Sequence, residues 1–146
     1  MPQMSVHVRS AHEGNFSVGW TGQHSLVIDR SPPDGGQGVG FDGRQLLLLA
    51  LGASYANEFF REAAKRELDV VGIRVIVECD WTDEPIRAQS IQFSTRVEAD
   101  ASEDEIMGLI QHVDQIAEVH NTLRAGTQVE LVEAEAVAVQ VEARET

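Results

Sequence analysis

The chain of 146 residues has a single cysteine, Cys79, which excludes an internal disulfide framework. Aromatic residues make up only 5% of the chain. The longest apolar run, Leu46–Ala53, is far shorter than the roughly 20 residues that a membrane-spanning helix needs. The N-terminal sequence "MPQMSVHVRS" also lacks the basic and apolar regions of a signal peptide. We therefore expect a cytoplasmic protein without a membrane anchor.

Basic residues are scarce, especially in the last third of the chain. The net charge is −13, and residues 97–146 hold 12 acidic residues but only two basic ones, Arg124 and Arg144. Such a surface repels phosphate backbones and anionic lipid headgroups. We therefore expect no binding to nucleic acid or to membranes, and we interpret the acidity as a contribution to solubility.

The sequence also lacks a pattern of metal ligands. Of the five histidines, only His112 and His120 stand near each other, and their spacing of eight residues is not that of a helical metal pair. We expect neither a metal site nor a cofactor.

What the sequence does contain begins with three short strands. The segments "SVHVRSA", "NFSVGW" and "HSLVID" alternate apolar and polar residues between turns, which is typical of an antiparallel meander. Residues 30–42 follow as a loop with two prolines and four glycines. Such a long loop is either functional or a plain crossover.

A long helix is predicted from Gly43 to Glu67. Asp42 and Gln45 have the spacing of a capping box. Leu46–Ala53 is apolar on all sides, so we expect it to be buried on every side. In the second half, the residues expected to face inward are Phe59, Phe60, Ala63 and Ala64, while Glu58 and Glu62 pair outside with Arg61, Lys65 and Arg66.

Two long strands, a second helix and a last strand complete the predicted order. Alternation in "VVGIRVIVECDW" places Val71, Ile73, Val75, Val77, Cys79 and Trp81 on one face, and "SIQFSTRVEA" forms the other half of a hairpin. Ser102 and Glu105 open a helix that ends near Ile116, and its predicted inner face consists of Ile106, Leu109, Ile110 and Val113. The tail "TQVELVEAEAVAVQVEA" is predicted to be a strand with a register change near residues 133–136, with a helix as the alternative.

The predicted order β-β-β-α-β-β-α-β corresponds to a single α+β domain over residues 1–146. The apolar half of the long helix is difficult to cover within one small chain. We therefore expect a second subunit to cover part of it in a homodimer.

Two stretches, "GGQGVGFDGRQLLLLALGAS" and "VHNTLRAGTQVEL", carry a family resemblance. The chain resembles the OsmC/Ohr family of osmotically inducible and organic-hydroperoxide-resistance proteins. The resemblance covers nearly the whole chain, and these two stretches are its best local matches. The resemblance implies an intertwined homodimer in which sheets wrap a central helix. It also implies thiol-based reduction of organic hydroperoxides in a small apolar pocket at the interface, where a second cysteine traps the sulfenic acid as a disulfide.

The residues at the family's reactive positions differ in this chain. The resemblance places the first cysteine at Ser54 and the second at Ala117, the glutamate at Arg44 and the arginine at His12. A serine hydroxyl cannot replace a thiolate as a peroxide reductant. We therefore expect a protein that has lost thiol peroxidase chemistry but retains an interfacial pocket for a small apolar or acidic ligand.

The candidate pocket-lining residues are Ser54, Tyr55, Arg44, His120 and Phe59, each with core packing or solvent exposure as the alternative. Alternation predicts that Cys79 is a buried structural cysteine. The enzymatic alternative is an organic hydroperoxide reductase that uses Cys79 or another non-standard site. A more distant alternative is an ester hydrolase in which His120 activates Ser54.

Overall fold

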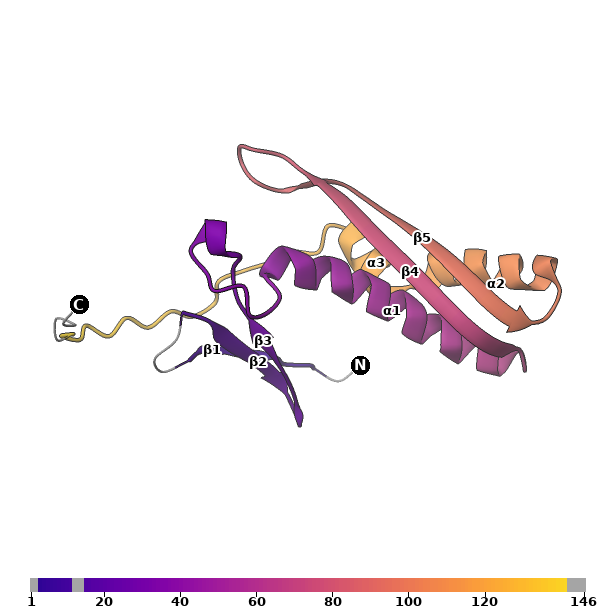
Figure 1. The fold of residues 1–146 in the computed structure, drawn as a ribbon, viewed down its shortest axis with the longest axis horizontal. Coiled ribbons are helices and arrows are strands. Elements are labelled where there is room, and N and C mark those ends of the chain that lie inside the picture. Colours follow the sequence, from indigo (N-terminus) through magenta and orange to yellow (C-terminus); the bar gives the residue numbers. More distant parts are fainter. Residues whose placement is uncertain (1–2, 12–14, 142–146) are drawn as a thin grey trace.

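The structure of the protein is a computed structural model that describes residues 3–11 and 15–141. Helices and strands segregate along the chain, which confirms the predicted α+β class (Figure 1). The elements are β1 (His7–Ser10), β2 (Ser17–Thr21), β3 (His24–Ile28), a 3-10 turn η1 (Pro32–Asp34), α1 (Gly43–Lys65), β4 (Asp69–Trp81), β5 (Ala88–Asp100), α2 (Glu103–Ile116) and α3 (Glu118–Arg124).

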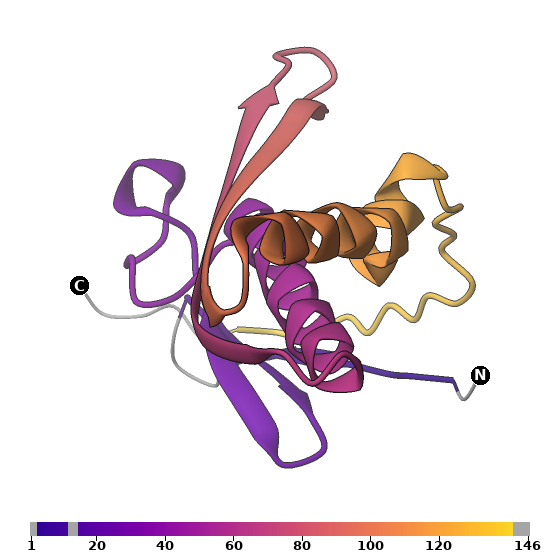
Figure 2. The same cartoon turned by 90° about the vertical axis from the view of Figure 1, so that its right-hand side faces the viewer.

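Two separate antiparallel sheets lie next to the long helix α1. The meander has the strand order β1-β2-β3 and lies beside the start of α1, while the β4–β5 hairpin runs along the helix (Figure 1). Turned by 90°, the molecule shows α1 and α2 together on one side of the hairpin (Figure 2). The main core therefore lies where α1, α2 and the hairpin meet.

The buried core is a cluster contributed mainly by the two helices. Its members are Tyr55, Phe59, Ala63, Leu109, Val113 and Ala117, and half-buried hairpin residues such as Val70, Ile73, Val75 and Phe93 pack against it. The periodicity of α2 predicted Leu109 and Val113 correctly. Ala117, which ends α2, is fully buried in this cluster.

The predicted capping box at the start of α1 is confirmed. The Asp42 carboxylate accepts a hydrogen bond from the backbone N–H of Gln45 at 2.8 Å, and the Gln45 side chain accepts one from the backbone N–H of Asp42 at 3.0 Å. At the start of α2, the Ser102 hydroxyl accepts a hydrogen bond from the backbone N–H of Glu105 at 3.2 Å. Both helices therefore begin where the sequence indicated.

The predicted burial of α1 is wrong in two places. Within the single chain, Leu49 is 48% exposed, so the apolar first half of the helix is not covered on every side. In the second half, Phe60 and Ala64 are exposed, whereas Glu58 and Glu62 are buried. The buried stripe follows the helical period from Leu51 through Tyr55 and Phe59, and the two carboxylates in that stripe are neutralised by ion pairs with Arg61 and Lys65.

The first inward residue of β4 is Val70, whereas alternation had predicted Val71. A register irregularity between Val70 and Gly72 interrupts the pairing with β5. Because such a bulge adds one residue to one strand, it reverses the alternation on either side of it. Val70 consequently packs against the core, and Val71 is 76% exposed.

The predicted final strand is not formed in the described part of the tail. Residues 127–141 have no regular secondary structure and are exposed throughout, and Figure 1 shows them running away from α3 past the start of α1. A strand needs a neighbour to satisfy its backbone groups, and none of the described strands pairs with this segment. Val129, Leu131 and Val132 therefore project into solvent.

The glycine-rich loop after β3 is organised by the buried carboxylate of Asp29. It accepts hydrogen bonds from the backbone N–H groups of Arg30, Gln37 and Val39, at 2.8, 2.9 and 3.1 Å. The loop is tightly folded, because a side chain at Gly36 would collide with the backbone of Arg30. This loop therefore has a well-defined structure of its own.

Candidate functional site

A small cavity lies between four elements of the fold. It measures about 120 Å³ and is lined by Leu51 of α1, Val77 of β4, Ile91 and Phe93 of β5, and His120, Leu123 and Arg124 of α3. The hairpin register places Val77 directly opposite Phe93, so both strands contribute to the same wall. Apart from His120 and Arg124, the lining is apolar.

His120 is the buried polar residue of this cavity, with only 4% of its surface exposed. Its ring stands edge-on to Phe93, with ring centroids 4.6 Å apart, and lies 5.8 Å from the ring of Tyr55. Neither ring nitrogen has a hydrogen-bond partner among the described residues. Burial lowers the pKa of His120, as does the positive charge of Arg124, while Asp114 acts in the opposite direction. The ring is therefore neutral at pH 7.

Arg124 lies one helical turn after His120, at the edge of the cavity. Its guanidinium donates hydrogen bonds to the Asp114 carboxylate at 2.7 Å and to the Asp114 backbone carbonyl at 2.8 Å. It also donates to the side-chain carbonyl of Asn121 at 3.2 Å. These contacts hold the guanidinium in place and compensate its charge with a carboxylate.

Tyr55 lies beside the cavity and belongs to the core. Its hydroxyl donates a hydrogen bond to the backbone carbonyl of Ile110 at 2.9 Å. Burial raises the pKa of Tyr55 to about 12, with a further contribution from the negative charge of Asp114. Tyr55 therefore remains a neutral hydrogen-bond donor, and it also lines an open groove between β5 and α2.

Ser54 and Ala117, which the sequence resemblance predicted to stand at the family's cysteine positions, lie in different environments. Ser54 is half-buried on α1, and Ala117 is fully buried in the core next to α3. Neither residue lines the cavity. The Ser54–His120 pair that an ester hydrolase would need is also not formed, because neither nitrogen of His120 hydrogen-bonds to Ser54.

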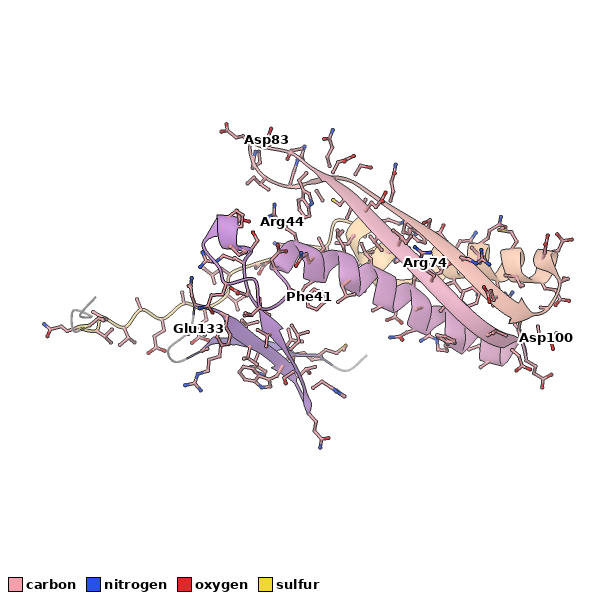
Figure 3. The ribbon with its side chains drawn as sticks, viewed as in Figure 1. Phe41, Arg44, Arg74, Asp83, Asp100 and Glu133 are labelled. Atoms are coloured by element: carbon pink, nitrogen blue, oxygen red, sulfur yellow. The ribbon has the colours of Figure 1, made fainter. Side chains whose placement is uncertain are left out.

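Of the other predicted candidates, Arg44 is on the surface and Phe59 is in the core. The Arg44 guanidinium lies 5.7 Å from the centre of the Trp81 ring and 4.0 Å from the Asp34 carboxylate, at the start of α1 and near the hairpin (Figure 3). Arg44 therefore makes surface contacts with its own chain and does not line the cavity. His12 lies outside the described residues.

Cys79 is half-buried, which differs from the buried position that alternation predicted. Its thiol donates a hydrogen bond to the backbone carbonyl of Asp80 at 3.4 Å. In the hairpin register, Cys79 stands opposite the cavity-lining residue Ile91. Cys79 therefore lies on β4 next to the cavity, but its thiol does not line the cavity.

Among the described residues, no group of three or more His, Cys, Asp or Glu side chains is arranged to hold a metal ion. In the same part of the chain, none of the helices is long and apolar enough to cross a bilayer.

Sequence reasoning identified His120 but missed the other residues that line the cavity. Leu51, Val77 and Phe93 have the appearance of ordinary core positions in the sequence, and they share a cavity only because α1 packs against the hairpin. Arg124 could have been predicted from the sequence, because a spacing of four residues places it on the same side of a helix as the candidate His120.

Comparisons with known proteins identify the fold and the family. Residues 35–132 match the model of the family described as OsmC-like protein. A comparison with curated proteins finds no match. The OsmC-like protein from Mycoplasma pneumoniae superimposes with a TM-score of 0.73 at 18% identity, covering 84% of this chain and 88% of that one.

Two organic hydroperoxide resistance proteins have the same fold. The protein from Legionella pneumophila has a TM-score of 0.61 at 13% identity, with coverage of 85% of this chain and 90% of that one. OhrB of Bacillus subtilis has a TM-score of 0.57 at 15% identity, with coverage of 84% and 90%. The family match covers well over half of the chain and confirms the resemblance found in the sequence. The chain therefore belongs to the OsmC-like protein family.

Proposed function

We propose that this protein is an OsmC-like homodimer that has lost thiol peroxidase chemistry at the family positions and uses its small cavity to bind a small molecule. The observation that carries the proposal is the pair of residues at the expected cysteine positions, Ser54 and Ala117. Reduction of a peroxide requires a sulfur that can take up oxygen and then form a disulfide. A hydroxyl and a methyl group do neither.

Retention of a binding cavity is supported by the character of its lining. A largely apolar cavity that is open on one side, with one buried histidine and an arginine at its edge, resembles a small-molecule site, in which a few polar groups orient an otherwise apolar ligand.

The homodimer is supported by the amount of apolar surface at one end of the chain. An apolar groove of about 450 Å³ lies between the meander and the start of α1, and it includes Trp20, Leu26 and Leu46. Leu49 on the same helix is 48% exposed, and the valines of the tail are exposed as well. Apolar surface on this scale usually marks a protein–protein contact, and a second copy of the chain presents the same surface.

The decisive experiment measures consumption of cumene hydroperoxide by the purified protein in the presence of a dithiol reductant. We expect no turnover above the reductant alone for the wild type and for Cys79→Ala. The double variant Ser54→Cys/Ala117→Cys serves as a test of the family positions, and we expect it to gain activity. Turnover by the wild type that disappears in Cys79→Ala would contradict the proposal.

A hydroperoxide reductase that uses Cys79 is the second candidate, and the partial exposure of this thiol beside a cavity-lining residue favours it. In that reaction the Cys79 thiolate would attack one peroxide oxygen and break the O–O bond. The sulfur would be oxidised to a sulfenic acid, and the substrate would leave as an alcohol after taking up a proton. With only one cysteine per chain, an external thiol would have to reduce the sulfenic acid. The same assay distinguishes the two candidates.

A further inference from the structure

The size of the His120 cavity limits the part of a ligand that can enter it to a few heavy atoms, although the cavity is open to the surface on one side. The cavity measures about 120 Å³. An engineered apolar cavity of about 150 Å³ in another protein binds benzene. A single six-membered ring or a short branched chain is therefore the largest apolar body that fits inside the cavity.

His120 determines which polar group a ligand of this cavity needs. A neutral imidazole has one N–H donor and one nitrogen acceptor. Both nitrogens are buried and neither has a partner among the described residues, which is costly for a polar group in an apolar environment. A hydroxyl group complements this ring, because it can donate to the bare nitrogen or accept from the N–H once the cavity wall shifts enough to uncover that nitrogen.

The charges at the cavity argue against an anionic ligand. Arg124 is the cation at its edge, but the Asp114 carboxylate already lies 2.7 Å from the guanidinium. A ligand carboxylate would approach this carboxylate as well and would have to lose its hydration shell among apolar side chains. An uncharged ligand avoids both costs.

We propose, on the basis of the binding function proposed above, that the cavity selects a small uncharged hydroxyl compound, with the apolar body against Leu51, Ile91 and Phe93 and the hydroxyl hydrogen-bonded to His120. This assigns a ligand class to the site and makes His120 its specificity-determining residue.

The test compares three probes of the same ring size, benzene, phenol and benzoate, for binding to the full chain by ligand-observed NMR and calorimetry. We expect phenol to bind at least about tenfold more tightly than benzene, and benzoate to bind more weakly than either. In His120→Leu the preference should reverse in favour of benzene. His112→Gln, which changes a histidine on α2 that does not line the cavity, should leave the preference unchanged.

Each result distinguishes this inference from the wider proposal. Binding of benzene without a preference for phenol would overturn the hydroxyl selectivity and leave the cavity as an apolar site. Tightest binding of benzoate would overturn it in favour of Arg124 as the anchor. Binding of none of the three would overturn both the inference and the binding function. If His120→Leu does not fold, the ring ¹⁵N shifts of wild-type His120 decide, because phenol but not benzene should move them.

Discussion

Asp29 shows how a single buried carboxylate can order a glycine-rich loop. Three backbone N–H groups donate to it, and these hydrogen bonds lower its pKa below the ordinary 3.8, against the opposing effect of burial. The loop between β3 and α1 was open to a functional interpretation in the sequence. In the structure, the hydrogen bonds that the loop makes to Asp29 account for its shape.

Replacement of Asp29 by Ala should therefore destabilise the fold at neutral pH. Because the folded-state pKa is depressed, the stabilisation is fully present above about pH 4 and is lost as the pH falls through the folded-state value. Thermal unfolding of wild type and Asp29→Ala across this range should show a difference in Tm that shrinks on acidification. Asp34→Ala removes an exposed carboxylate from the same loop and should have a smaller effect. A pH-independent difference for Asp29→Ala would contradict this account.

His120 should titrate below its ordinary pKa of 6.5, because burial and Arg124 both disfavour its charged form. The unfolded chain then takes up this proton at a higher pH than the folded chain does. Stability from this group is therefore greatest above pH 6.5 and declines as the pH falls below it. Histidine-selective NMR titration gives the pKa directly. A His120 signal that titrates above 6.5 would show that the ring is not held as described.

At the scale of elements, the β4–β5 hairpin combines a simple pattern with one irregularity. Alternation sets the inward residues over most of β4, while the bulge near Gly72 shifts the pattern at the beginning of the strand. This shift brings Val70 to the core side, beside the end of α1.

Two neighbouring substitutions test the bulge. Val70→Ala should lower the free energy of unfolding by about 1–2 kcal/mol, because it removes methyl groups that pack against the core. Val71→Ala is its matched control and should change it by less than about 0.5 kcal/mol, since Val71 is 76% exposed. Urea unfolding measures both. Equal losses, or a larger loss at Val71, would mean that the strand keeps regular alternation.

At the scale of the whole molecule, the distribution of apolar surface is uneven. One face of the second half of α1 is covered by the hairpin and α2, with Phe60 exposed on the other face. The meander and the first half of α1 expose apolar side chains such as Val8, Leu26 and Leu49. Together with the exposed tail, this end of the chain offers the surface that we propose for a second subunit.

Leu49→Glu should convert the proposed homodimer into a monomer, because a charge in an apolar contact is costly to bury. Size-exclusion chromatography with light scattering measures the mass directly. Ser94→Glu places the same charge on an exposed position of β5 and should leave the mass unchanged. A wild-type protein that is already monomeric, or a Leu49→Glu variant that remains dimeric, would contradict this arrangement.

The sequence by itself determined the class of the fold, the order of most elements and the helix starts. The reason is that the information is local. Strand alternation has a period of two, helical apolar stripes have a period near 3.6, and a capping box such as Asp42 with Gln45 lies within one helical turn. That the chain has a single cysteine, Cys79, was also visible without a structure.

Only the tertiary structure decided which residues meet at the candidate site. His120, Leu51 and Phe93 come from three elements, and their meeting depends on how α1 and α3 pack against the hairpin. The same holds for the buried Glu58 and Glu62, whose ion pairs offset the cost of burial, and for the tail, which forms no strand with the described residues. Strand pairing and cavity lining are contacts between distant segments, and no local pattern encodes them.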